Sequence, residues 1–139
     1  MRKIILLILI ILAGLACIIG YLLFGASAQI LGQKSFGMQL TVSDTLGFNI
    51  DTNAVYFGKA TPNSMVKRDI IVNNNLMERA LVVFEKSGEL AGWVTPSLNE
   101  FYLNPGESKS VTLTAKIPND AKMAEYSGKI VVYFMKAHN

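Results

Sequence analysis

The sequence predicts an all-β sandwich of seven or eight strands that is preceded by one N-terminal transmembrane α-helix. An uncharged apolar run extends from Ile4 to Phe24, and short alternating stretches separated by turn residues follow it. Between residues 36 and 139 the best helical candidate, Asp120 to Tyr126, is only one or two turns long. We therefore expect a transmembrane segment at residues 1–25, a short tether at 26–35 and an antiparallel, extracytoplasmic sandwich at 36–139.

The opening apolar run is long enough to cross a bilayer as a helix. Its 21 residues would span about 31 Å, which matches the thickness of a hydrocarbon core. Arg2 and Lys3 precede the run, so we expect a single-pass protein of the cell membrane with a cytoplasmic N-terminus and an extracytoplasmic C-terminal domain. The run exceeds the usual apolar length of a cleaved signal, which favours a retained signal anchor; cleavage after Ala28, within a run of small residues, is the alternative.

Small residues form a stripe within this run. Ala13, Ala16, Cys17 and Gly20 have the spacing i, i+3, i+4, i+7, which places them on one face of a helix. Such stripes let a second helix approach closely in lipid. The sequence therefore predicts a helix-packing face, with the ordinary composition of membrane helices as the alternative.

The first half of the outer segment contains several strand signals. Met38, Leu40 and Val42 alternate with polar residues, which predicts a strand with one buried face. Further strands are predicted at residues 48–51, 55–57 and 66–72, and the last of these ends in the turn-prone triplet 73–75. Residues 80–84 are apolar on both faces, as in a central strand, before Lys86-Ser87-Gly88 ends that pattern.

The second half carries the clearest alternation. Short strands are predicted at residues 93–95 and 101–103, and a Pro-Gly turn at 104–106 follows them. Residues 129–135 are apolar on both faces, which predicts a strand deep in a sheet. From these patterns we expect one set of side chains to be largely buried: Val111, Leu113, Ala115, Ile117, Ile130, Val132 and Phe134.

Composition and residue types argue against several functions. From residue 29 onward eleven basic residues stand against ten acidic ones, with alternating signs, so no nucleic-acid surface is predicted. The lone cysteine, Cys17, excludes an intrachain disulfide, and the single histidine, His138, is one residue from the end. Asp51-Thr52-Asn53 has two calcium-type ligands without the rest of a loop. We expect no enzyme, no catalytic residues, no cofactor and no metal site.

Two stretches resemble a known group of modules. FGKATPNSMVKRDIIVNNN and WVTPSLNEFYLNPGESKSVTLTAKIPNDAKMAEYSGKIVVYF resemble immunoglobulin-like sandwiches of the sperm-protein, Hydin and NEW3-like group, as found in archaeal and bacterial envelope proteins. The resemblance covers about residues 45–135 and implies an immunoglobulin-like fold, without implying an activity. Ala124 stands where the group usually has a glycine, which puts the turn there in doubt. Tyr126 is expected to be a corner tyrosine whose hydroxyl bonds to the backbone.

The function predicted from these features is a non-catalytic one. The chain would be a membrane-anchored accessory or structural subunit, or an envelope-binding module. Its partners would be the membrane and a protein: a subunit of a membrane complex, another copy in self-assembly, or a component of the cell envelope. One alternative is an archaeal pilus- or archaellum-associated filament or stator-like component, and another is a cleaved, secreted binding module. Trp93 is either an aromatic buried between the sheets or an exposed residue that binds a partner.

Overall fold

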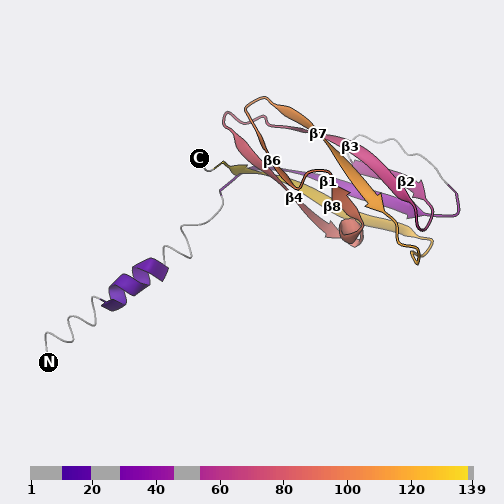
Figure 1. Cartoon of the computed structure of the whole chain (residues 1–139), viewed down its shortest axis with the longest axis horizontal. Helices are drawn as coiled ribbons and strands as arrows, with labels where there is room; N and C mark the ends of the chain where they lie inside the picture. Colours follow the sequence, from indigo (N-terminus) through magenta and orange to yellow (C-terminus); the bar gives the residue numbers. More distant parts are fainter. Residues whose placement is uncertain (1–10, 20–28, 46–53, 138–139) are drawn as a thin grey trace.

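A computed structural model of the chain describes residues 11–19, 29–45 and 54–137 (Figure 1). Within these ranges the chain after residue 29 forms eight β-strands and one short 3-10 helix, η1. Their order along the chain is β1 (Ile30–Val42), β2 (Ala54–Ala60), β3 (Met65–Asn73), β4 (Ala80–Gly88), η1 (Glu89–Gly92), β5 (Val94–Pro96), β6 (Glu100–Leu103), β7 (Ser108–Lys116) and β8 (Glu125–Lys136).

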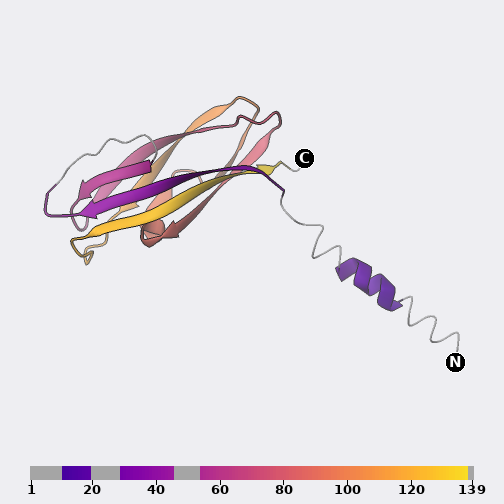
Figure 2. The same cartoon turned by 180° about the vertical axis from the view of Figure 1, so that it is seen from behind.

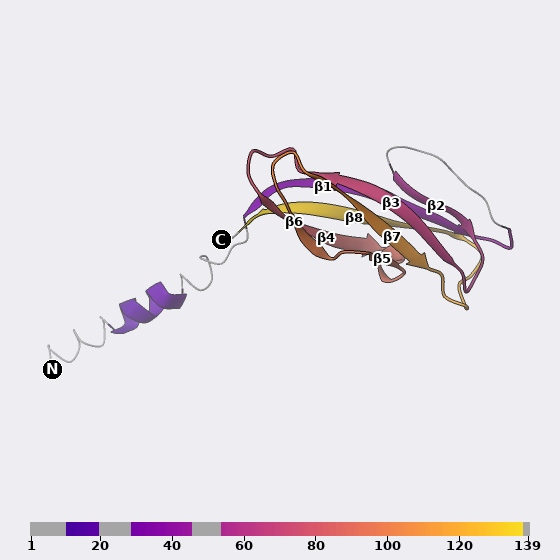
Figure 3. The ribbon, with the colours of Figure 1, turned by 45° about the horizontal axis from the view of Figure 1, so that its top comes forward.

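The strands form two sheets that face each other (Figure 3). Sheet A has five strands in the order β2-β1-β8-β4-β6, and sheet B has three strands in the order β3-β7-β5. This mostly-β arrangement in two sheets agrees with the sandwich predicted from the alternating pattern. The predicted strand at residues 48–51 lies outside the described residues, and the immunoglobulin-like assignment stays a prediction.

Strand pairing departs from the prediction in two ways. All pairs are antiparallel except β1 with β2, which run parallel from Gly37 beside Ala54 to Val42 beside Ala60. The expectation of an entirely antiparallel sandwich is therefore wrong. In addition, β1 begins at Ile30, so residues 30–35, which the sequence analysis assigned to the tether, pair with β8.

The core lies between the two sheets and is apolar. The seven side chains predicted to be buried are buried, with exposed fractions from 0% to 8%. Met38, Leu40 and Val42 of β1 and Phe57 of β2 join them. In β1 and β7 the period-two pattern predicted this core because a one-residue shift would have exchanged the apolar and polar faces of the strand.

Two glycines allow the chain to leave sheet A at the end of β4. Gly88 has φ of +85°, a left-handed conformation that side chains disfavour, and it pairs with Gly128 of β8. A Cβ on Gly128 would lie 2.9 Å from the Ser87 carbonyl oxygen and 3.1 Å from the Cβ of Leu90. The absence of side chains here therefore lets η1 turn inward and bury Leu90 completely.

Two cationic side chains connect the sheets at their edges. Arg68 of β3 donates from Nε to the Tyr56 carbonyl of β2 at 2.8 Å. Lys86 of β4 donates from Nζ to the Val94 carbonyl of β5 at 2.6 Å. Both side chains satisfy main-chain oxygens across the gap between sheets, which buried or half-buried carbonyls require. Neither cation is therefore simply solvated.

The predicted transmembrane helix is corrected by the structure. The described part of the chain has one α-helix before the sandwich, at residues 11–19, and none that is long and apolar enough to cross a membrane. The prediction of a single-pass signal anchor is therefore wrong on these residues, as is the cell-membrane location with a cytoplasmic N-terminus and an extracytoplasmic domain. Residues 4–10 and 20–24 of the predicted span lie outside the described residues.

Candidate binding surfaces

The outer face of sheet A carries apolar side chains on its central strands. On β4, Leu81 and Val83 point away from the core, because their neighbours Ala80 and Val82 are fully buried. On β8, the alternation places Val131, Tyr133 and Met135 on the same outer face. All five are half-buried only by their neighbours in the sheet. An outer sheet face in contact with water is normally polar, so this face is unusual.

Strand register joins these side chains into a continuous surface. Met135 lies beside Ile30 of β1 and Leu81 of β4, and Leu81 in turn lies beside Tyr102 of the edge strand β6. Ile30 and Tyr102 are exposed, at 56% and 45%. Tyr133 and Val83 form the next row. We call this surface the apolar band, and it consists of Ile30, Leu81, Val83, Tyr102, Val131, Tyr133 and Met135.

Charged groups flank the band along β4. The Arg79 guanidinium lies 4.3 Å from the centre of the Tyr102 ring, a cation–π contact at one end of the strand. Glu85 lies beyond Val83 on the same outer face, at the other end of the band. A hydrogen bond with the Glu85 carboxylate, followed by burial and the charge of Glu85, raises the pKa of Tyr133 above its ordinary value of 10.0. Along β4 the outer face therefore runs from a basic residue to an acidic one, while Glu100 of β6 lies beside Val83.

Sheet B has a different outer face. Its outward positions on β7 are Ser110, Thr112 and Thr114, and Lys67 and Asp69 of β3 lie beside the two threonines. The hydroxyl of Thr112 donates to the Asp69 carboxylate at 2.5 Å. Two large apolar side chains also lie on this face of β3, Ile71 with 63% of its surface exposed and Met65 with 52%. The apolar band is thus a property of sheet A and not of both outer faces.

Trp93 lies at the seam between the sheets. Its ring packs on that of Tyr126 with a centroid distance of 4.5 Å, and both residues are half-buried against the core. The Tyr126 hydroxyl donates to the Lys122 carbonyl at 3.1 Å, so the corner tyrosine predicted from the sequence is confirmed. Trp93 therefore closes the seam with part of its surface exposed, and its role toward a partner stays a prediction.

The predicted helix-packing stripe is only partly described. Ala13, Ala16 and Cys17 lie in the helix at residues 11–19, all of whose side chains are exposed. Cys17 is a free thiol. Gly20 lies outside the described residues, as do His138 and the Asp51-Thr52-Asn53 stretch. The stripe stays a prediction.

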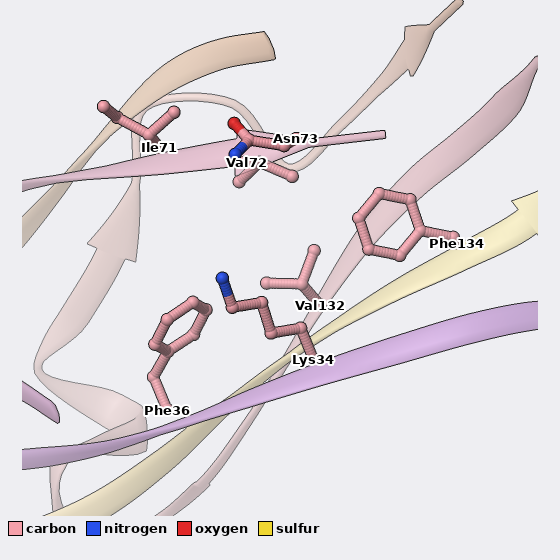
Figure 4. Close-up of a pocket in the computed structure, with 7 residues that line it drawn as sticks. All are labelled: Lys34, Phe36, Ile71, Val72, Asn73, Val132 and Phe134. Atoms are coloured by element: carbon pink, nitrogen blue, oxygen red, sulfur yellow. The ribbon is translucent and has the colours of Figure 1, made fainter. Parts of the chain in front are cut away.

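A small hollow opens between the sheets where β1, β8 and β3 meet. Lys34 extends into it from β1, between Phe36 and Val132 and toward Val72 (Figure 4). Its ammonium is 5.0 Å from the centre of the Phe36 ring. The volume of the hollow is about 10 Å³, enough for about one water molecule and too little for a small-molecule ligand. Among the described residues, no cluster of three or more acidic, cysteine or histidine side chains could hold a metal ion.

Comparison with protein-family models, curated proteins and solved structures finds no match for this chain. The apolar band is the functional feature that the sequence analysis missed. Its signal was present, because residues 80–84 and 129–135 are apolar on both faces. That pattern predicted two strands in the interior of a sheet, which is confirmed; it did not show that their outer side chains are only half-buried.

Proposed function

We propose that this chain is a non-catalytic structural module that assembles with a second copy of itself through the apolar band. The observation that carries the proposal is the contrast between the two outer faces: the central strands of sheet A carry mainly apolar side chains there, and the strands of sheet B carry mainly polar ones. Contiguous apolar surface on a folded module is characteristic of protein–protein interfaces. Aromatic residues, methionine and arginine are enriched in such interfaces, and Tyr102, Tyr133, Met135 and Arg79 are all present here.

The charges beside the band favour a second copy as the partner. The outward side chains of β4 and of the residue before it are Arg79, Leu81, Val83 and Glu85. In this order they are basic, apolar, apolar and acidic. A two-fold axis through the middle of these four residues would place Arg79 of each copy opposite Glu85 of the other. Isologous interfaces of this kind are the commonest in oligomers, and two sheets can pack face to face about 10 Å apart. The outward residues of β4 therefore complement their own arrangement in charge.

Sedimentation equilibrium of the full chain tests this proposal. The wild type should associate with increasing concentration, and Leu81→Lys should weaken association at least tenfold because it places a charge in the band. Ile71→Lys is the matched control, since it makes the same kind of change on the outer face of sheet B. The exposed apolar side chains at residues 11–19 are common to all variants. Equal association of Leu81→Lys and the wild type would reject the band as the interface.

A charge-swap pair tests the two-fold arrangement separately. Arg79→Glu should weaken association because like charges would then meet across the interface, and adding Glu85→Arg should restore it. Arg79 and Glu85 are six residues apart on one strand, about 20 Å, so the restoration cannot come from contact within one chain. A monomeric wild type at all concentrations would reject self-assembly and favour an accessory subunit that binds a different protein.

A further inference from the structure

Each sheet of the sandwich ends in two edge strands. Sheet A ends in β2 and β6, and sheet B ends in β3 and β5. An edge strand has a row of main-chain groups without a partner strand, and these groups can pair with a strand of another molecule. Proteins prevent such pairing by shortening the edge strand, interrupting it or placing charges on it. The four edges of this sandwich differ in these features.

Three of the four edges are protected by their own structure. β5 has three residues and ends in Pro96, and β6 has only four residues. The pairing of β2 with β1 contains a register shift. β2 and β3 lie side by side along one margin of the sandwich, where the Arg68 guanidinium occupies the Tyr56 and Phe57 carbonyls of β2 (Figure 2). Little of these three edges is therefore available to an added strand.

β3 is the long and regular edge. Its nine residues include no proline or glycine, and its pairing with β7 has no register shift from Met65 beside Lys116 to Asn73 beside Ser108. Among the described residues, β7 is the one strand that pairs with it. Arg68 also donates to the Lys67 carbonyl, at 2.9 Å, but a carbonyl oxygen has two lone pairs and can accept a second hydrogen bond.

The outward side chains of β3 complement their own arrangement. Met65, Lys67, Asp69 and Ile71 lie on the outer face of sheet B, and all four are exposed. Their order along the strand is apolar, basic, acidic, apolar. In an antiparallel pair of β3 strands centred on Arg68, Lys67 of each copy lies opposite Asp69 of the other, and Met65 lies opposite Ile71. Opposite charges and apolar pairs in directly opposed positions stabilise a sheet, whereas like charges destabilise it.

The charges on β3 select this register against its neighbours. A pair centred on Lys67 would place two ammonium groups opposite each other, and a pair centred on Asp69 would do the same with two carboxylates. In the register centred on Arg68, the two arginines are neighbours at the axis. Each guanidinium, however, is held by the Tyr56 carbonyl of its own β2, at 2.8 Å. The charges therefore oppose most pairings of this edge and permit one.

We propose that β3 pairs with β3 of a second copy, antiparallel and centred on Arg68, which joins two three-stranded sheets into one sheet of six strands. This contact goes beyond the apolar band and does not depend on it. It consists mainly of main-chain hydrogen bonds and of side-chain pairs at the surface, so we expect it to be the weaker of the two contacts. A copy that uses both contacts is linked to two other copies, which gives a linear series of subunits.

Sedimentation equilibrium of full chains that carry Leu81→Lys tests the pairing without the band. One chain also carries Lys67→Asp, and a second chain carries Asp69→Lys instead. Either chain alone should associate about tenfold more weakly than Leu81→Lys, because two attractive pairs become repulsive. An equimolar mixture of the two should associate as Leu81→Lys does, since every opposed pair then has opposite charges. Urea unfolding of each chain confirms that it is folded.

The matched control makes the same two charge changes on β8, on the outer face of sheet A. Lys129 and Glu125 are exposed there, so chains with Lys129→Asp and Glu125→Lys report the effect of net charge alone. Singly and mixed, these chains should associate as Leu81→Lys does. A mixture of the β3 variants no stronger than its components would overturn the pairing. A Leu81→Lys chain that is monomeric at all concentrations would also overturn it.

The outcome is separable from that of the apolar band. The band is judged by the difference between the wild type and Leu81→Lys, and the β3 pairing is judged by differences among chains that all carry Leu81→Lys. Ile71→Lys, the control variant for the band, keeps both pairs of Lys67 with Asp69 at the centre of the β3 contact. Either contact can therefore be rejected while the other is supported.

Discussion

The side-chain amide of Asn74 donates a 3.0 Å hydrogen bond to the main-chain carbonyl of Leu103, twenty-nine residues away in the chain. The same amide reaches the carbonyl of Glu78 at 3.0 Å and that of Asn104 at 3.2 Å. Asn74 is fully buried. One polar side chain thus fastens the connection after β3 to the end of β6 and to the Pro-Gly turn that precedes β7.

We expect Asn74→Ala to lower the free energy of unfolding by about 2–3 kcal/mol, because one buried and several half-buried main-chain groups would lose a hydrogen bond at once. Asn74→Asp should be at least as damaging, since a carboxylate would face carbonyl oxygens. Asn75→Ala, at the exposed neighbouring position, is the control and should change stability by less than about 0.5 kcal/mol. Urea unfolding measures all three, and an Asn74→Ala variant as stable as the control would contradict this account.

Arg68 is expected to stabilise the edge where β2 meets β3. Its guanidinium reaches the carbonyls of Tyr56 and Phe57 with two different nitrogens, at 2.8 and 3.4 Å. Lysine has no such fork, so Arg68→Lys should cost about 1 kcal/mol in unfolding free energy. Lys67→Met, at the exposed position before it, serves as the comparison. A loss for Arg68→Lys no larger than for Lys67→Met would show that the cross-sheet bonds add nothing.

The core was predictable from the sequence because alternation is a local signal. Val111, Leu113 and Ala115 repeat every second residue between polar neighbours, and no other register would bury them. The hydrogen bonds of Asn74 were not predictable in this way. The triplet at residues 73–75 indicated a turn, but nothing local shows that the middle side chain would meet residue 103.

The place of β1 within sheet A could not be predicted from the sequence, for a related reason. Its apolar alternation predicted a strand with one buried face, and that is confirmed. The sequence of a strand does not specify which strands pair with it. Neither the parallel pairing with β2 nor the extension of β1 to Ile30 could therefore be predicted from the sequence. The apolar band could not be predicted because its sequence pattern has two interpretations. A strand that is apolar on both faces can be covered by another layer or by a partner, and the sequence alone does not separate the two cases.

Leu113 is the core position whose truncation should be most informative. It is fully buried on β7, the central strand of sheet B. Leu113→Ala should lower the free energy of unfolding by about 2–5 kcal/mol, through lost burial and the cavity that remains. Ser110→Ala on the exposed side of the same strand should be nearly neutral. If the two variants unfold at the same urea concentration, β7 does not lie where the structure places it.

Tyr133 should make stability fall at alkaline pH. Its hydrogen bond with Glu85, together with burial and the charge of Glu85, raises the pKa of Tyr133 above 10.0, so the folded state favours the neutral phenol. This contribution is present below the unfolded pKa of about 10 and is lost as pH rises through the higher folded value.

Between pH 9 and 11 the wild type should therefore lose more stability than Tyr133→Phe. Glu85→Gln should lose less than the wild type, because it removes the negative charge that opposes ionisation. Urea midpoints across this range, with the tyrosinate absorbance of each variant, measure the effect. Parallel pH profiles for the wild type and Tyr133→Phe would show that this pair does not link stability to pH.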